Sequence, residues 1–184
     1  CIGAFARMPY RRGKARAERL LRRVLNADEL EARSPAGVRY RLAPDEVVQR
    51  EILLHGAYEP RTLALMHRLL RPGDTMVDVG GHVGQYALHA ARAVGEAGRV
   101  IAFEPNPRTY RYLLRNVELN EAGATVTAVL AAVDTCVGVA PMAAGREENW
   151  GLASLATQGG PSFYVATVPL GDALRALGVR RVDV

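Results

Sequence analysis

Features that mark several protein classes are scarce or absent in this sequence. Only two cysteines occur, Cys1 and Cys136, which are too few for a disulfide framework and show no metal-ligand spacing. No apolar run approaches the roughly 20 residues that a membrane-spanning helix requires. We therefore expect neither a disulfide-stabilised secreted domain nor an integral membrane protein. The sparse cysteines fit a cytoplasmic location, and no metal site is expected.

Two common phosphate-binding signatures are missing as well. A Walker loop ends in Gly-Lys-Ser or Gly-Lys-Thr, and neither tripeptide occurs. The Gly-x-Gly-x-x-Gly fingerprint of nicotinamide and flavin enzymes, counted from Gly80, needs glycine at two positions that His82 and Gln85 occupy. A nucleotide-like ligand that lacks a pyrophosphate is therefore favoured.

The chain is long and apolar enough for one folded domain. It has 184 residues, of which 49% are hydrophobic, so we expect a globular fold and not a disordered chain. It begins at Cys1 instead of methionine and stops within the strand-like run 179–184. We interpret it as a fragment of a longer protein.

The positive charge is concentrated at the N-terminus. Residues 1–23 contain eight arginine and lysine residues and one acid, Glu18, so this arm carries +7 while the rest of the chain carries −2 of the net charge of +5. Apolar residues recur with a helical period from Ala15 to Leu30, with arginines between them. Such a basic helix could lie on an acidic membrane or on nucleic acid. It has no aromatic anchor, and we favour a surface helix that packs on its own domain.

The middle of the chain predicts an alternation of strands and helices. Apolar periodicity and turn residues place strands at 76–79, 100–103 and 126–133, with helices at 83–94 and 107–120. This order is typical of a parallel sheet with helices on its faces. Right-handed crossovers then place the C-terminal ends of the strands on one edge, where α/β sheets bind their ligands.

Shorter elements are predicted on both sides of this unit. They are a half-buried strand at 38–42, helices at 44–56 and 60–70, a strand at 165–170, a helix at 172–177 and the start of a further strand at Val182. Residues 134–163 are rich in glycine and proline and predict no regular element.

A strand, a glycine-rich turn and the start of a helix follow one another after Thr75. Gly80 and Gly84 let the backbone bend tightly or approach a ligand, because glycine has no Cβ. The free N–H groups of the next helix favour an anionic or nucleotide-like ligand. Glu104 ends the following strand, 20 residues after Gly84, on the same sheet edge. A carboxylate there can accept hydrogen bonds from ribose hydroxyls, and we favour this role over that of an exposed strand-end charge.

Taken together, these segments resemble the class I S-adenosylmethionine-dependent methyltransferases and, more narrowly, the FkbM family. The matching segments are residues 77–86, 100–107, 113–120, 149–155 and 168–174. The resemblance implies an α/β fold with a Rossmann-like, doubly wound and mostly parallel sheet, truncated here at its C-terminal end. It divides the chain into a basic N-terminal arm with a helical and strand extension, residues 1–55, and an incomplete cofactor-binding domain, residues 56–184.

The resemblance also implies S-adenosylmethionine as the cofactor and assigns residues to it. By the part of the cofactor that they would face, these are Asp78, Gly80, Gly81 and Gly84 for the methionine half, Glu104 for the ribose, Pro105 and Asn106 for the adenosine, and Ala131 with Ala132 for the adenine. His82 is assigned to the site as well. Two alternatives stay open for it, a contact with the cofactor carboxylate and a cap on the following helix.

The same resemblance implies an enzyme that methylates a hydroxyl group of a sugar, a lipid or a secondary metabolite. We expect a small-molecule acceptor and no nucleic-acid partner. The catalytic base stays unassigned, because the acidic signature of the family would fall beyond Val184. Asn149, Trp150 and Ser154 are candidates for the acceptor face, although a packed turn at this place is slightly favoured.

Two other functions stay open on the sequence. A nucleic-acid methyltransferase would share the cofactor site and use the basic arm to hold phosphates. The Asp/Asn-Pro-Pro-Tyr/Phe loop that suits base amino groups is not found, however. A nicotinamide-dependent oxidoreductase would also place a strand-end acid on a ribose, but the spacing of the glycines argues against it.

Overall fold

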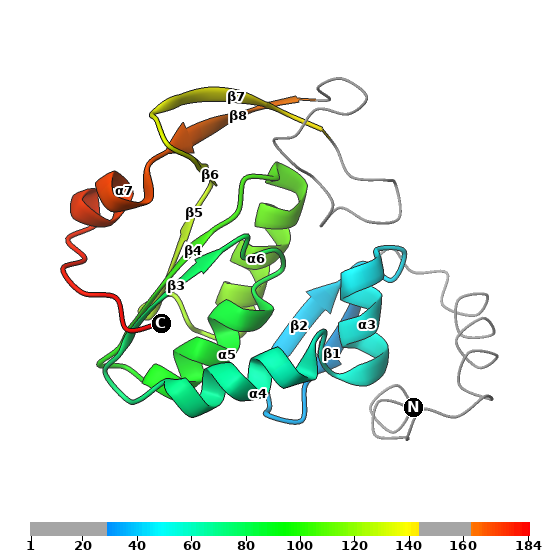
Figure 1. Cartoon of the computed structure of the whole chain (residues 1–184). Coiled ribbons are helices and arrows are strands. Elements are labelled where there is room, and N and C mark those ends of the chain that lie inside the picture. Colours follow the sequence, from blue (N-terminus) through cyan, green and yellow to red (C-terminus); the bar gives the residue numbers. More distant parts are fainter. Residues whose placement is uncertain (1–28, 144–162) are drawn as a thin grey trace.

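The computed structural model describes residues 29–143 and 163–184 (Figure 1). Its elements in chain order are β1 (Leu30–Arg33), β2 (Arg39–Leu42), α3 (Val47–His55), α4 (Pro60–Leu69), β3 (Thr75–Val79), α5 (Gln85–Val94), β4 (Arg99–Phe103), α6 (Pro107–Leu119), β5 (Val126–Val129), β6 (Ala132–Val133), β7 (Gly138–Met142), β8 (Phe163–Val168) and α7 (Leu170–Ala176). None of the helices in these ranges is long and apolar enough to cross a membrane.

The central sheet consists of β3, β4 and β5, which are parallel and lie in that order. The last residues of the chain run along the other edge of β3. Asp183 donates its N–H to the Thr75 carbonyl at 2.8 Å, and Val77 donates its N–H to the Val184 carbonyl at 2.9 Å. The chain therefore moves outward from β3 to β5 and then returns past β3. In open α/β sheets, ligands bind at the carboxyl ends of the strands where the order reverses in this way.

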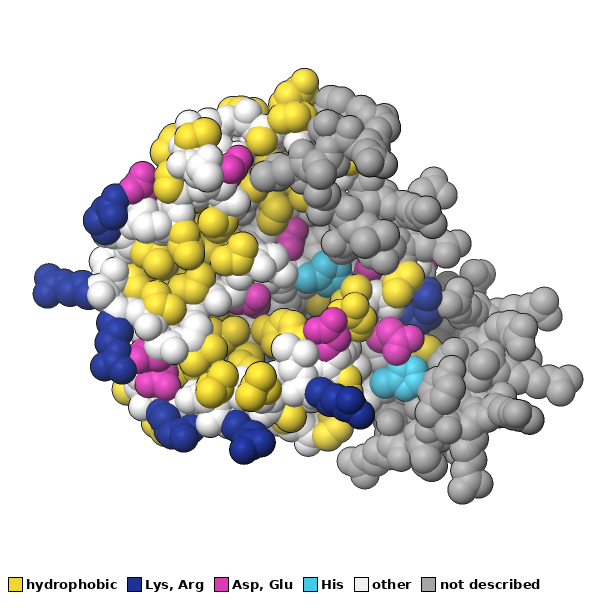
Figure 2. All heavy atoms as spheres, viewed as in Figure 1, with side chains coloured by type: hydrophobic (Ala, Val, Ile, Leu, Met, Phe, Trp, Pro, Cys, Tyr) yellow, Lys and Arg dark blue, Asp and Glu magenta, His cyan; other side chains and the backbone are white. Residues whose placement is uncertain are grey.

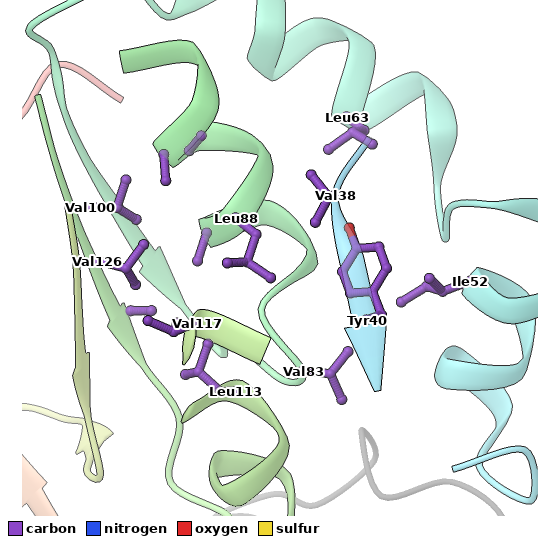
Figure 3. Close-up of a cluster of buried hydrophobic side chains, with 14 of the residues drawn as sticks. Val38, Tyr40, Ile52, Leu63, Val83, Leu88, Val100, Leu113, Val117 and Val126 are labelled. Carbon is purple, nitrogen blue, oxygen red and sulfur yellow. The ribbon is translucent and has the colours of Figure 1, made fainter. Parts of the chain in front are cut away.

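Helices α5 and α6 lie on one side of the central sheet, and α7 lies on the other (Figure 1). The main hydrophobic cluster fills the space between the sheet and helices α5 and α6, and it continues to β2. Figure 3 shows Leu88 between Val100 of the sheet and Val38, the residue directly before β2. Tyr40 belongs to the same cluster and is fully buried. Residues 30–55 thus share one core with the sheet domain, and the proposed division after residue 55 stays a prediction.

Asn116 of α6 and Asn120, the C-cap residue of that helix, hold the edge of β2. Asn116 is fully buried, accepts a hydrogen bond from the Arg41 N–H at 2.6 Å and donates one to the Val83 carbonyl at 2.9 Å. Asn120 accepts from the Arg39 N–H at 2.9 Å and donates to the Arg39 carbonyl at 2.6 Å. Residues four apart share one face of a helix, and residues two apart present their backbone to one edge of a strand. The two amides therefore pair with the free edge of β2 as a neighbouring strand would.

Five predicted helices form within the described residues. Helices α4 and α6 begin at the predicted residues, whereas the N-terminal ends of α3, α5 and α7 are shifted. Helix α3 begins at Val47, because the Glu46 side chain accepts a hydrogen bond from the Gln49 N–H and caps it. Helix α5 begins at Gln85, because Gly84 has a left-handed φ of 88° and is the cap residue. Most of the helix predicted at 15–30 lies outside the described residues, but its last residue, Leu30, belongs to strand β1.

The strand predicted at 126–133 is wrong in one respect, since it divides into β5 and β6. After Val129 the chain leaves β4, and β6 pairs with β8 in a second sheet with the order β6-β8-β7. Strand β7 was not predicted, because Gly138 and Pro141 interrupt its pattern. Among the described strands it lies at the edge of the sheet and pairs only with β8, and an edge is where a strand tolerates proline. No strand is assigned at Val182, although Asp183 and Val184 already bond to β3.

Replacing Asn116 by alanine should destabilise the fold. The variant leaves the Arg41 N–H and the Val83 carbonyl without their partner, which should lower the free energy of unfolding by about 1 to 3 kcal/mol. The exposed Glu118 of the same helix provides the control, since Glu118→Ala should change it by less than about 0.5 kcal/mol. Urea denaturation measures both values. Equal losses in the two variants would contradict the role given to the Asn116 amide.

Candidate functional site

The loop after β3 is fixed to the end of β4. The N–H groups of Gly80 and Gly81 both donate to the Phe103 carbonyl at 2.8 Å. Gly80 has a φ of 88° and open space around the position of a Cβ, so its need for glycine is one of backbone conformation. Gly84 has the same φ, and a Cβ there would lie only 2.7 Å from Cδ1 of Leu113. The loop therefore turns tightly against α6 and leaves its Gly80 side open.

The Glu104 carboxylate links the loops that follow β3 and β4. Its Oε2 accepts the His82 N–H and its Oε1 accepts the Asn106 N–H, both at 2.8 Å. Glu104 is buried, and this burial raises its pKa to about 7, although the two hydrogen bonds lower it and the charge of Asp78 raises it further. Each carboxylate oxygen has a second lone pair. Glu104 can therefore still accept hydrogen bonds from a ligand.

Asp78 is a second buried carboxylate near the end of β3. Burial raises its pKa to about 6, while a hydrogen bond from the Ala87 backbone lowers it. Its Oδ2 is buried and has no hydrogen-bond partner in the part of the chain that the structure describes. A buried acceptor without a partner is costly. Asp78 and Glu104 together suit a ligand that brings hydroxyl donors and a positive charge. Figure 2 shows acidic side chains and a histidine gathered near the centre of one face, with arginines along its lower and left rim.

Of the two roles left open for His82, the cap on the following helix is not seen in the structure. The cap residue of α5 is Gly84, without a side-chain cap bond. Nε2 of His82 lies instead 3.8 Å from Oε2 of the fully buried Glu46. Burial lowers the pKa of His82 to about 4, so the imidazole is neutral at pH 7 and this contact is not an ion pair. The backbone of His82 has a φ of 50°, which histidine tolerates better than a branched residue does.

Some of the other residues assigned to the site lie in the loop after β4, and the rest lie elsewhere in the chain. Asn106 caps α6, because its Oδ1 accepts the Arg108 N–H at 3.0 Å, and Pro105 lies half-buried between Glu104 and Asn106. The structure thus brings the loop after β3 and residues 104–106 together at one sheet edge. Ala131 and Ala132 are both buried where the chain passes from β5 to β6. Asn149, Trp150 and Ser154 lie outside the described residues.

The sequence analysis did not indicate the contacts that hold the segment before α4 against the first turn of α5. Gln85 accepts a hydrogen bond from the Tyr58 N–H at 2.6 Å and donates one to the Tyr58 carbonyl at 2.8 Å. Tyr86 donates its hydroxyl to Glu59 at 3.1 Å. Each pair is separated by 27 residues, so no local pattern could have indicated it.

Comparison with known proteins identifies the class of this domain. A family model described as the TRM5/TYW2 methyltransferase domain matches residues 36–142, which is more than half of the chain. The chain belongs to this family. The predicted α/β fold with a parallel sheet, the methyltransferase class and the S-adenosylmethionine cofactor are therefore confirmed. The narrower FkbM resemblance is not shown by this match and stays a prediction.

Individual relatives of the TRM5/TYW2 domain cover smaller parts of the chain. A segment of 67 residues, 36% of this chain, is 39% identical to 12% of a tRNA (guanine(37)-N(1))-methyltransferase of Danio rerio. The same length is 34% identical to 26% of the methyltransferase sdnD of Sordaria araneosa. The solved structure of M. jannaschii TYW2 in complex with AdoMet has 20% identity and a TM-score of 0.47 over 58% of this chain and 44% of that one. The matches thus span only a minor part of each curated relative.

This family relationship contradicts one expectation from the sequence, that of a small-molecule acceptor without a nucleic-acid partner. The zebrafish relative is by its name a tRNA methyltransferase, and the family is that of TRM5 and TYW2. The expectation was wrong because it rested on the glycine loop and on Glu104. These residues were assigned to the cofactor, and methyltransferases with different acceptors share that part of the fold.

Replacing His82 by asparagine should reduce the loss of stability in acid. The folded-state pKa of His82 is lowered from 6.5 to about 4, so as the pH falls from 6.5 to 4 the unfolded chain takes up a proton that the folded chain does not. The free energy of unfolding therefore decreases in this window. The variant, which has no imidazole there, should lose on the order of 1 to 2 kcal/mol less by pH 5. Urea denaturation at pH 7.5 and pH 5 measures the difference, and equal acid losses would mean that Glu46 stabilises a protonated His82.

Proposed function

We propose that this chain forms the cofactor-binding part of an S-adenosylmethionine-dependent RNA methyltransferase, with tRNA as the first substrate to test. The observation that carries this proposal is the pair of buried carboxylates, Asp78 and Glu104, beside the glycine loop of a TRM5/TYW2 domain. Such a site needs a ligand with hydrogen-bond donors and positive charge. S-adenosylmethionine has ribose hydroxyls, an ammonium group and a sulfonium.

Each residue at the sheet edge has a role in this proposal. Glu104 accepts the ribose hydroxyls through its remaining lone pairs, and Asp78 faces the charged methionine half. The glycine loop lets the backbone approach the cofactor without Cβ atoms in between. Pro105 and Asn106 lie beside the adenosine, and Ala131 with Ala132 leave room at the adenine. His82 is the least defined member, and its contact with the cofactor carboxylate stays a prediction.

The bound cofactor supplies an electrophilic methyl group, and transfer to a nucleophile is an in-line displacement. The protein contributes by holding donor and acceptor close and aligned. Within the described residues, Asp78 and Glu104 already serve the cofactor in this proposal. The group that would accept a proton from the RNA base is therefore left unassigned.

The choice of RNA rests on the family and on charge. The zebrafish relative carries the name of a tRNA methyltransferase. The sequence of residues 1–23 carries a charge of +7, which suits contacts with phosphates. A nicotinamide-dependent oxidoreductase loses its support, because the matched family consists of methyltransferases. The cytoplasmic location stays a prediction.

Cofactor affinity should rise with pH. Without ligand the pKa is about 6 for Asp78 and about 7 for Glu104, and a ligand with donors and positive charge favours their ionised forms. Binding below pH 7 should therefore release protons, so affinity should increase from pH 5.5 to 7.5. Glu104→Gln should bind about 10- to 100-fold more weakly at pH 7.5, because it removes a charged acceptor, and should show a flatter pH profile. Isothermal titration calorimetry of a full-length protein measures both effects, with Glu118→Gln as the control.

A methyl-transfer assay tests whether RNA is the acceptor. A full-length protein with radiolabelled S-adenosylmethionine should transfer the methyl group to a transfer RNA transcript, and Glu104→Gln should reduce this transfer at limiting cofactor. Cofactor binding without transfer to any RNA would overturn the RNA part of the proposal alone. Absence of cofactor binding would overturn all of it.

A further inference from the structure

We propose that a pocket beside the cofactor loops binds one nucleotide of the RNA strand through its backbone phosphate. This inference rests on the proposed RNA methyltransferase function. The pocket has a volume of about 680 Å³ and lies between the first turns of α6 and the segment that leads from β2 to α3. That volume is in the range of ligand-binding pockets and is large enough for a nucleotide.

Two residues of the pocket wall are close in the sequence to residues that contact the candidate cofactor loops. Arg108, in its α6 wall, follows Asn106 by two residues, and Asn106 donates its backbone N–H to Glu104. Asp45, in the opposite wall, precedes Glu46, whose carboxylate lies 3.8 Å from the His82 ring. A nucleotide in this pocket would therefore lie next to both loops assigned to the methyl donor.

The α6 wall carries the chemistry of phosphate recognition. Arg108 and Arg111 are three residues apart on the helix, so they share one face, and both are exposed. The guanidinium carbon of Arg111 lies 5.9 Å from the centre of the Tyr112 ring, which helps to fix its position. The planar fork of arginine matches the geometry of phosphate oxygens. Arg108 and Arg111 would bind the phosphate from one side.

The acidic residues of the pocket argue for a whole nucleotide over a free anion. Glu29 is paired with Arg115 at 2.7 Å, so its charge is compensated. Asp45 stands on the wall opposite the arginines, where a carboxylate would repel a second phosphate but could accept hydrogen bonds from a base amino group. The pocket thus offers donors on one wall and an acceptor on the other.

The sequence next to the pocket supports a polyanionic partner. Glu29 is the first described residue and lines the pocket. The eight basic residues between Arg7 and Arg23 precede it in the chain by a short interval. An RNA strand held at the pocket would therefore run close to the attachment point of a strongly basic segment.

Charge reversal at one arginine tests this site. In a full-length protein, Arg111→Glu should weaken binding of a transfer RNA transcript at least tenfold and should reduce the slope of log affinity against log salt by about one. Fluorescence anisotropy at several KCl concentrations measures both. The matched control is Arg61→Glu on α4, which is exposed and does not line the pocket, and should change the affinity less than threefold. S-adenosylmethionine affinity should stay unchanged in both variants, which shows that they fold.

A further variant and two competitors distinguish the possible explanations of a loss in RNA affinity. Arg111→Lys, which keeps the charge and loses the fork, should recover part of the affinity. Guanosine monophosphate should compete with RNA better than inorganic phosphate does, and equal competition would overturn the nucleotide in favour of a simple anion site. Equal losses in Arg111→Glu and Arg61→Glu, or full RNA affinity in Arg111→Glu, would overturn the pocket while the proposed function stands. A wild-type protein that binds no RNA would overturn both.

Discussion

Two acceptors at the end of β4 hold the loops of the candidate site in place. The Phe103 carbonyl accepts the N–H groups of Gly80 and Gly81, and the Glu104 carboxylate accepts those of His82 and Asn106. Backbone N–H groups that leave a strand must find partners when they are buried. Here the end of β4 supplies the hydrogen-bond acceptors for the turn that follows β3. The position of the glycine loop, and the approach of α6 to it, depend on this single point of the sheet.

The same arrangement raises the free energy of two carboxylates in their ionised forms. Asp78 and Glu104 are both buried, and the pKa of each is raised, to about 6 and about 7. The folded chain is therefore more stable when they are protonated than when they are ionised. Functional sites often carry such a cost, since a group that is poorly satisfied alone becomes well satisfied with its ligand. In this domain the cost lies where α/β sheets bind ligands, at the strand ends beside the reversal of strand order.

Sequence periodicity was enough to predict the β–α–β–α–β unit, because each of its elements has a local apolar pattern and a cap or turn residue. Glu104 could be found in the same way, as an acid that ends a strand one unit after the glycine loop. The contact of His82 with Glu46 and the bonds of Asn116 to Arg41 and Val83 could not. Their partners lie 36, 75 and 33 residues away, and only the tertiary packing of β2, α3, α6 and the loop after β3 brings them together. The expectation of a small-molecule acceptor was wrong for a different reason, since a glycine loop followed by a strand-end acid is common to methyltransferases that modify very different molecules.

The pairing of α6 with β2 also bears on how the molecule behaves in a crowded solution. An uncovered strand edge offers a row of N–H and carbonyl groups to which a strand of another molecule can attach. In β2 the N–H groups of Arg39 and Arg41 are already taken by Asn120 and Asn116. Side-chain amides thus close an edge that would otherwise be a template for aggregation. The helix that packs on the core therefore also shields the β2 edge of the β1–β2 hairpin from pairing with another molecule.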